Sequence, residues 1–195
     1  MIAIIDYKAG NLTSVKKAFD YIGAQPVVTD DPDVVAKADK IVLPGVGHFA
    51  ATRALDNGIR DTVQQGIKAG KPFLGICVGM QWMFTGSEES PETRGLCAIE
   101  CACARFESSV KSPHVGWNHL RTEPDSRLMR GVGPLAYVYF THSYRAPVVP
   151  ETVATTFYGG AFSAAVERDN IFGVQFHPEK SAETGLQILR NFCEL

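Results

Sequence analysis

The residues best suited to catalysis form a short segment, Gly75-Ile76-Cys77-Val78-Gly79, in which a thiol stands between two glycines. An apolar run at 73–76 precedes the cysteine and a helix-compatible stretch follows it. This is the setting of a nucleophile elbow, with a thiol in place of a hydroxyl. Glycine neighbours permit the strained backbone of such a turn. A helix that begins directly after the cysteine favours the thiolate, its reactive form. The alternative is that Cys77 is a small buried residue at the end of a strand.

A base for that thiol is available at His177, with Glu179 two residues later. The apolar stretch at 171–175 predicts a strand before them, and Pro178 constrains the turn between them. We expect His177 to take the thiol proton and Glu179 to orient the imidazole, as in other nucleophile–histidine–acid sites. The alternative is a surface turn that carries a histidine and a glutamate by chance.

An oxyanion formed at a substrate carbonyl needs hydrogen-bond donors, and backbone amides can supply them. One candidate is the amide of Val78, at the start of the predicted helix. The other is the loop Gly45-Val46-Gly47, in which glycine permits a peptide orientation that points an N–H at the site. That loop could equally be an ordinary connection between a strand and a helix.

The remaining histidines and cysteines do not predict a metal site or another cofactor. Three histidines are irregularly spaced, without the paired ligands that metal sites use: His114, His119 and His142. Cys101-x-Cys103 could bind a metal or form a redox pair, but a second pair of ligands is missing. We interpret 96–106 as a strand with small alternating side chains.

Strands and helices alternate in the first half of the chain and lead up to these residues. Apolar runs predict the strands, and the stretches between them have helical periodicity. The predicted strands are 1–6, 26–29, 40–43 and 73–76. The predicted helices are 12–22, 32–38 and 50–69, the last with an interruption near Asn57-Gly58. This alternation indicates a parallel sheet, in which sites form at the carboxyl ends of the strands.

The second half of the chain has shorter apolar runs separated by turns, which indicates antiparallel strands. We predict them at 96–106, 120–122, 137–141, 153–157, 164–167 and 171–175, followed by a helix at 184–194. The expected fold is of the α/β class, with an open mixed, mostly parallel central sheet flanked by helices. Short antiparallel strands belong to its second half. At this length we expect a single domain over 1–195.

The composition argues against several classes of partner. With 19 basic and 21 acidic residues the net charge is −2, which favours neither nucleic acid nor an anionic membrane. No apolar run is long enough to span a bilayer, and Met1–Asp6 predicts a strand rather than a signal peptide. Five cysteines, an odd number, fit a reducing compartment, so we expect a cytoplasmic protein.

Two segments resemble the class I glutamine amidotransferases, which use a cysteine–histidine–glutamate triad: Gly75–Gln81 and Gln175–Lys180. The resemblance implies that Cys77 attacks the side-chain amide of glutamine, that His177 moves the protons and that Glu179 orients it. It implies that the Gly45–Gly47 loop completes the oxyanion hole. It also implies a set of residues around bound glutamine, namely Gln81, Glu89 and the backbone of His142, Ser143 and Tyr144.

Further segments resemble one group within this class, the glutaminase subunits of imidazole glycerol phosphate synthases. They are 6–15, 44–49, 113–118 and 142–144, so the resemblance covers nearly the whole chain. It implies a heterodimer in which ammonia passes to a (β/α)₈-barrel cyclase subunit. That subunit makes imidazole glycerol phosphate and an aminoimidazole carboxamide ribotide in histidine biosynthesis. It also implies that the isolated glutaminase subunit is nearly inactive.

Three residues are candidates for the interface with that partner. Asn11 and Lys180 follow strand ends on the catalytic side of the sheet. Trp117 is either an interface anchor or a core tryptophan packed on a turn. The chain departs from the group at Cys97 and at Glu100-Cys101, where the group carries glycine and proline. Any role of Cys97, Cys101 and Cys103 stays open.

Other functions are compatible with parts of the pattern. An amidotransferase subunit of another synthase, such as anthranilate or pyridoxal phosphate synthesis, is disfavoured by Tyr7–Asn11 and Pro113–Asn118. A regulator that kept the fold but lost activity is disfavoured by the intact triad. A cysteine peptidase or a thiol enzyme like the α/β-hydrolases is disfavoured by Gln81 and by His177-Pro178-Glu179.

Overall fold

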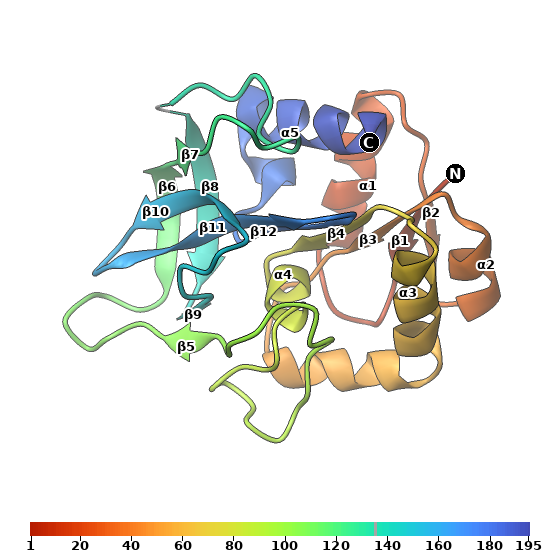
Figure 1. Ribbon diagram of the computed structural model, residues 1–195, viewed down its shortest axis with the longest axis horizontal. Helices are drawn as coiled ribbons and strands as arrows, with labels where there is room; N and C mark the ends of the chain where they lie inside the picture. The colour runs from red at the N-terminus through yellow and green to blue at the C-terminus, as the bar shows by residue number, and fades with distance from the viewer. Residues whose placement is uncertain (135) are drawn as a thin grey trace.

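The computed structural model describes residues 1–134 and 136–195, and an eight-stranded sheet runs through its centre (Figure 1). Its strand order is β2-β1-β3-β4-β12-β11-β10-β7. The first five strands in this order are Val27–Thr29 (β2), Ile2–Ile5 (β1), Lys40–Leu43 (β3), Phe73–Ile76 (β4) and Ile171–Val174 (β12). Each is parallel to its neighbour among these five. The sheet therefore places the ends of β3, β4 and β12 side by side.

Burial on both faces explains why these strands are apolar throughout. Every residue of β1, β4 and β12 is buried. Such strands show no alternation of polar and apolar residues, because helices cover both sides of a parallel sheet. The predicted strands at 1–6, 40–43, 73–76 and 171–175 are confirmed to within two residues at each end.

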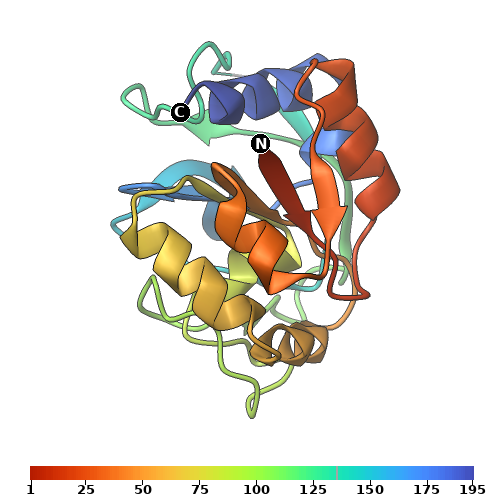
Figure 2. The same ribbon diagram turned by 90° about the vertical axis from the view of Figure 1, so that its right-hand side faces the viewer.

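Helices form a layer on each face of the sheet. Leu12–Tyr21 (α1) and Ala182–Glu194 (α5) pack against each other on one face, as Figure 2 shows from the side. The other face carries Phe49–Asp56 (η1, a 3-10 helix), Ile59–Lys68 (α3) and Val78–Trp82 (α4), while Pro32–Lys37 (α2) packs on α3. The predicted helix at 50–69 is confirmed with its interruption, because Gly58 adopts a φ of +106° between η1 and α3.

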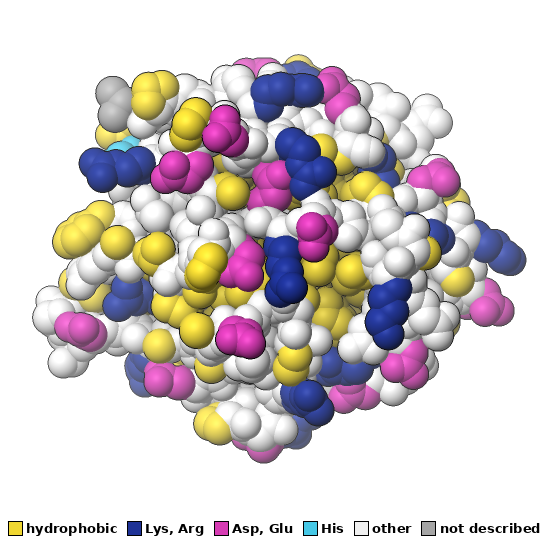
Figure 3. Space-filling view, viewed as in Figure 1, with side chains coloured by type: hydrophobic (Ala, Val, Ile, Leu, Met, Phe, Trp, Pro, Cys, Tyr) yellow, Lys and Arg dark blue, Asp and Glu magenta, His cyan; other side chains and the backbone are white. Residues whose placement is uncertain are grey.

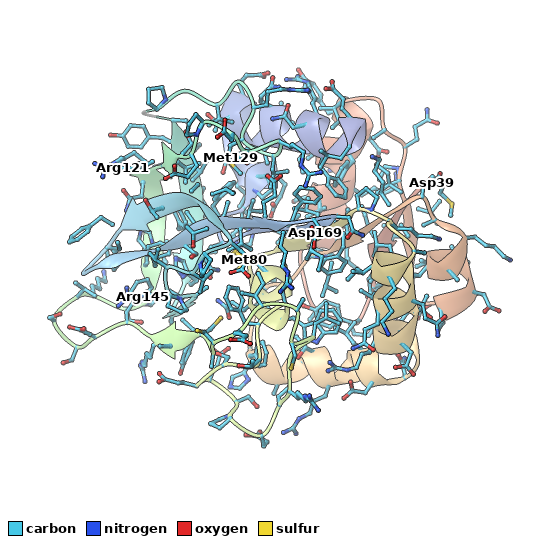
Figure 4. All side chains as sticks on the ribbon, in the orientation of Figure 1. Asp39, Met80, Arg121, Met129, Arg145 and Asp169 are labelled. Atoms are coloured by element: carbon cyan, nitrogen blue, oxygen red, sulfur yellow. The ribbon has the colours of Figure 1, made fainter. Side chains whose placement is uncertain are left out.

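Close contact between α4 and the sheet depends on a missing side chain. Met80, labelled in Figure 4, extends from α4 toward the sheet. A Cβ added to Gly173 of β12 would lie 2.8 Å from Met80 Cγ and 2.8 Å from Met83 Sδ. A glycine at this position therefore allows the helix that follows Cys77 to pack directly on the strand that leads to His177.

The second half of the chain adds antiparallel strands. Ala161–Arg168 (β11), Thr152–Phe157 (β10) and Arg121–Thr122 (β7) extend the central sheet beyond β12. His114–His119 (β6) and Tyr137–His142 (β8) form a separate antiparallel pair, which we call the β6–β8 ribbon. A short pair joins Ala104–Arg105 (β5) to Tyr144–Arg145 (β9). The expected α/β fold with a mostly parallel sheet is confirmed.

Two predictions for the second half were wrong. The predicted strand at 96–106 is an irregular loop apart from β5, because Cys97 and Cys101 adopt φ angles of +59° and +87° that a strand does not tolerate. The strand β6 was not predicted, although it is six residues long. Its inward side includes His114 and its outward side includes Trp117, so the usual apolar-in, polar-out alternation is absent.

The face of the molecule in Figure 3 carries lysine, arginine, aspartate and glutamate side chains interspersed with apolar ones. This mixture matches the small net charge and gives that face no excess of either sign. Within the described ranges, no helix has both the length and the apolar character required to cross a bilayer.

Candidate active site

Cys77 stands at the end of β4 in a strained conformation, with φ +54° and ψ −106°. Its N–H donates to the carbonyl oxygen of Val174 at 2.8 Å, which continues the pairing of β4 with β12 by one residue. The chain then turns sharply into α4. A non-glycine residue in this region is uncommon and persists only where the surroundings determine it. The predicted strand, elbow and helix are all present.

Tight packing of the two flanking glycines provides those surroundings. A Cβ on Gly79 would lie 1.9 Å from the carbonyl oxygen of Leu43, at the end of β3. A Cβ on Gly75 would lie 2.4 Å from the carbonyl oxygen of Gly79. Both distances are far below van der Waals contact, so only glycine fits either position. The backbone on both sides of Cys77 is therefore held by neighbouring backbone.

His177 and Glu179 form a buried pair beside the elbow. His177 Nδ1 lies 2.8 Å from Glu179 Oε1, and each side chain is only 1% exposed. Among the described residues, His177 Nε2 has no hydrogen-bond partner, so this nitrogen is free to exchange a proton. Burial lowers the pKa of His177, but the adjacent Cys77 sulfur and the hydrogen bond and charge of Glu179 outweigh it and raise that pKa to about 10.

Two further groups contact the Cys77 sulfur. Gln175 Nε2 donates to Sγ at 3.6 Å, and the carbonyl oxygen of Thr141 lies 3.9 Å from it. A neutral donor to the sulfur stabilises the thiolate. Gln175 was quoted in the sequence pattern but not predicted as a site residue. Its position two residues before His177, on the same side of an extended chain, was the available signal.

The loop Gly45-Val46-Gly47 lies against the start of α4. A Cβ on Gly45 would lie 2.7 Å from Val78 Cβ and 2.5 Å from the hydroxyl oxygen of Tyr7. Gly47 has a φ of +101°, which favours glycine. The loop thus packs beside Cys77 and Val78, and its role as an oxyanion donor stays a prediction. Tyr7 was not predicted as a site residue, and its side chain is buried beside the loop.

A cavity of about 280 Å³ opens at Cys77. The five residues predicted to surround glutamine all line it, together with Gly47, Cys77, Val78 and two residues that were not predicted, Pro113 and Thr141. Gly45 and Val46 lie beside the cavity rather than in its lining. Its size suits a small polar ligand with the reactive carbon held against the sulfur.

Polar contacts hold two of the lining side chains. Glu89 Oε2 accepts from the N–H of Phe49 at 2.7 Å, which leaves further acceptor capacity on this carboxylate. Gln81 Nε2 donates to the carbonyl oxygen of Tyr144 at 2.9 Å and to Gln175 Oε1 at 3.0 Å. One buried amide thereby connects α4, which follows the elbow, to β9 and to the residue directly after β12.

Two of the three candidate interface residues lie near the same ring, that of Tyr139 on the ribbon. Trp117 is 53% exposed and meets the ring of Tyr139 edge-on, and Lys180 Nζ lies 5.7 Å from the centre of the same ring. This exposure rules out the core interpretation of Trp117. Asn11 has a different contact, because its side chain caps α1 by accepting from the N–H of Ser14 at 3.4 Å.

The other cysteines are spread over different surroundings. Cys97 and Cys101 are exposed, whereas Cys103 is buried and burial raises the pKa of its thiol. Both exposed residues have left-handed φ angles, which glycine adopts more readily. Within the part of the chain that the structure describes, no three histidine, cysteine, aspartate or glutamate side chains are grouped as metal ligands.

Comparisons with known proteins agree with this geometry. A family model described as "Glutamine amidotransferase class-I" matches residues 3–195. The chain is 50% identical to the "Imidazole glycerol phosphate synthase subunit HisH" of Methanothermobacter thermautotrophicus, covering 100% of this chain and 98% of that protein. It is 48% identical to the protein of the same name in Chlorobaculum tepidum, with complete coverage of both.

Solved structures share the fold at low sequence identity. A structure described as a glutamine amidotransferase has a TM-score of 0.79 at 18% identity, covering 100% of this chain and 98% of the other. PurLQS from Thermotoga maritima has a TM-score of 0.75 at 19% identity, covering 99% and 97%. The full-length matches at high identity carry the assignment. The chain belongs to the class-I glutamine amidotransferase family and, within it, to the HisH subunits of imidazole glycerol phosphate synthase.

Proposed function

We propose that the chain hydrolyses glutamine to glutamate and ammonia through a thioester on Cys77, and that the ammonia is used by a cyclase partner. One observation carries this proposal. The strained Cys77, the buried His177–Glu179 pair and a cavity of suitable size meet at the carboxyl ends of neighbouring strands. A nucleophile, a base and an orienting carboxylate in this arrangement are the requirements of acyl transfer.

The reaction follows from the roles that the geometry supports. The Cys77 thiolate adds to the side-chain amide carbon of glutamine, and the amides of Val78 and the Gly45–Gly47 loop bind the oxyanion. The C–N bond breaks as His177 Nε2 gives its proton to the departing ammonia. Water then adds to the thioester while His177 takes one of its protons. Cleavage of the C–S bond releases glutamate and returns the thiolate.

The cavity supplies recognition of the rest of the substrate. Glu89 is placed to bind the α-amino group of glutamine, since its carboxylate has acceptor capacity beyond the Phe49 amide. Gln81 and the backbone of His142, Ser143 and Tyr144 bind the remaining polar groups from the opposite side. The cavity is large enough for one amino acid, which favours free glutamine over a peptide.

The partner is a cyclase subunit with a (β/α)₈ barrel, and the two subunits form a heterodimer. Support comes from the names of the relatives and from an apolar surface on the outer side of the β6–β8 ribbon, where Val115, Trp117 and Tyr137 are all more than half exposed. Aromatic residues are enriched at such interfaces. Ammonia reaches the partner without release, and the products are imidazole glycerol phosphate and aminoimidazole carboxamide ribotide, made in the cytoplasm.

The decisive experiment measures glutamine hydrolysis by the pure chain with and without the cyclase subunit and its nucleotide ligand. We expect low activity alone and a sharp rise in the complex. Equal activity in both samples would contradict coupling to the partner. Loss of coupling would still leave hydrolysis itself to be tested through Cys77.

Cys77→Ala separates the two half-reactions in the complex. Glutamine-dependent synthesis should fall by a factor of about a thousand or more, because the nucleophile is gone. Synthesis from added ammonia should persist, since the cyclase does not need the thiol. Cys97→Ala, at an exposed cysteine, is the matched control and should change neither rate. A parallel loss of ammonia-dependent synthesis in Cys77→Ala would show that Cys77 is not a dedicated glutaminase nucleophile.

A further inference from the structure

Two buried histidines of the β6–β8 ribbon lie on the side of the ribbon that faces the inside of the molecule. His114 of β6 and His142 of β8 are directly opposite each other in the strand register, and both side chains face inward. His114 Nδ1 and His142 Nε2 are 3.0 Å apart. His142 lines the cavity, whereas His114 does not and has no part in the reaction described above.

Their hydrogen bonds leave each nitrogen a single role. The carbonyl oxygen of Tyr144 lies 2.9 Å from His142 Nδ1 and can only accept, so His142 Nδ1 carries the proton. In a neutral ring, His142 Nε2 is then an acceptor, and His114 Nδ1 must donate to it. His114 Nε2 is left as an acceptor.

The contacts of Asn118, at the outer end of this series of hydrogen bonds, require the same tautomer of His114. Asn118 Nδ2 donates to the carbonyl oxygen of Phe157 at 3.2 Å, while Asn118 Oδ1 accepts from the N–H of His119 at 2.9 Å. These contacts fix which way the amide points. Its Nδ2 also lies 3.3 Å from His114 Nε2, to which it donates. Both ends therefore independently demand the Nδ1–H form of His114.

An apolar surround keeps the pair neutral. Aromatic side chains pack on His114, with its ring stacked on Tyr158 at 4.1 Å and on Phe140 at 4.8 Å between centroids. Burial lowers the pKa of His114 to about 4. Burial also lowers the pKa of His142 to about 3, despite the opposing hydrogen bond to Tyr144. Neutral rings permit the donor–acceptor alternation just described.

The inner end of this series of hydrogen bonds reaches Cys77. The Tyr144 carbonyl that His142 binds also accepts from Gln81 Nε2, which in turn donates to Gln175 Oε1. Gln175 Nε2 then donates to the Cys77 sulfur. An unbroken series of buried and partly buried hydrogen bonds thus joins Asn118, on the ribbon, to the thiol.

We propose that His114 is a positioning residue for glutamine hydrolysis, which acts by donating to His142 Nε2 and so holding the His142 ring where its Nδ1–H fixes the Tyr144 carbonyl against Gln81. This inference rests on the proposed function for its kinetic consequence only. Without the His114 donor, the buried Nε2 of His142 has no hydrogen-bond partner, while the Tyr144 carbonyl still keeps the proton on Nδ1. The ring is then free to shift, and its Nδ1–H no longer holds the carbonyl that orders Gln81.

The first test needs no activity. Long-range ¹H–¹⁵N correlation spectra of the ¹⁵N-labelled wild-type chain at neutral pH distinguish the two tautomers of each histidine. Both His114 and His142 should be protonated at Nδ1. An Nε2–H form of either ring would overturn the proposal even if glutamine hydrolysis proceeds as described. Failure of the proposed function would leave this spectrum unchanged, so the two failures are distinguishable.

The second test compares variants in the complex with the cyclase. His114→Phe keeps an aromatic ring and removes the donor. Its KM for glutamine should rise about tenfold, the equivalent of one lost hydrogen bond, with kcat within threefold. His114→Asn should recover most of this loss because its amide nitrogen lies near the position of Nδ1. Ammonia-dependent synthesis should be unchanged in both variants.

Tyr158→Phe is the matched control. It keeps the ring that stacks on His114 and removes only the hydrogen bond from the hydroxyl to the carbonyl oxygen of Lys111. Its KM should equal that of the wild type. An unchanged KM in folded His114→Phe, or equal losses in the Phe and Asn variants, would contradict the positioning role. If His114→Phe does not fold, the Asn variant and the tautomer spectrum decide the matter.

Discussion

Cys77 and Cys101 both have a positive φ angle, but their surroundings differ. Cys77 is buried at the end of β4, where β3, β12 and α4 pack around it. Cys101 is exposed in the loop that follows α4, with a φ of +87°. There the carbonyl oxygen of Cys101 accepts from the N–H and hydroxyl of Thr85, at 3.0 and 2.8 Å.

The comparison shows when backbone strain is a functional signal. Such a conformation costs on the order of 1–3 kcal/mol and persists where the surrounding structure determines it. At Cys77, glycine packing and strand pairing hold the turn, and the strained residue lines a cavity. At Cys101 the same kind of strain holds an exposed thiol that does not line this cavity. We therefore expect the strain at Cys77 to serve the site and that at Cys101 to lower stability without affecting hydrolysis.

Among the variants that test this comparison, Gly79→Ala should have the largest effect on the free energy of unfolding. The new Cβ would have to displace the Leu43 carbonyl from a distance of 1.9 Å, which disrupts β3 and the elbow together. We expect the free energy of unfolding to fall by about 3 kcal/mol or more, measured by urea denaturation.

Gly133→Ala is the matched control, because nothing lies within 4 Å of a Cβ at that turn. Its unfolding free energy should stay within about 0.5 kcal/mol of the wild type or rise slightly. Equal stability of Gly79→Ala and the wild type would mean that neighbouring backbone does not hold the elbow.

Glu179→Gln should have the next largest effect on the free energy of unfolding, because it removes the negative charge that stabilises protonated His177. The pKa of His177 is raised in the folded chain. The ion pair with Glu179 therefore stabilises the folded chain fully at pH values below about 6.5, the pKa of histidine in the unfolded chain. That contribution is lost as the pH rises toward 10. The variant should therefore be less stable by about 2 kcal/mol near pH 6.5, and the difference should shrink toward pH 10.

Denaturation at a series of pH values measures this difference, and glutamine hydrolysis should fall by about two orders of magnitude or more. Glu183→Gln is the control, since its carboxylate forms an exposed ion pair with Arg190 and should contribute below about 0.5 kcal/mol. A Glu179→Gln deficit that stays constant from pH 6.5 to 10 would argue against the charged pair.

Cys101→Gly should change the free energy of unfolding least, and should raise it rather than lower it. Glycine adopts a φ of +87° without the steric cost of a Cβ, so the chain should gain about 1 kcal/mol in unfolding free energy with unchanged hydrolysis. The neighbouring substitution Ala102→Gly lacks this benefit and should lose about 0.5–1 kcal/mol, which makes it the control. A loss in both variants would show that Cys101 is not strained.

Much of the fold was predictable from local pattern. The buried strands of the parallel half were recognised because their runs are apolar throughout, and the break at Asn57-Gly58 because glycine interrupts a helix. The loop at 96–106 was misread as a strand since its left-handed positions carry cysteine instead of the glycine that would reveal them. The strand β6 was missed because its inward residues include a histidine.

The sequence by itself determined which groups are available for catalysis: a thiol between glycines, and a histidine and a glutamate after a strand. It also indicated where along the chain the strands that carry them lie. These features are local, and residue type and spacing decide them. Only the tertiary structure decided that His114 and His142 belong to one continuous series of hydrogen bonds reaching Cys77, and that Trp117 is exposed. Such features depend on pairing between residues far apart in the chain, which no local pattern specifies.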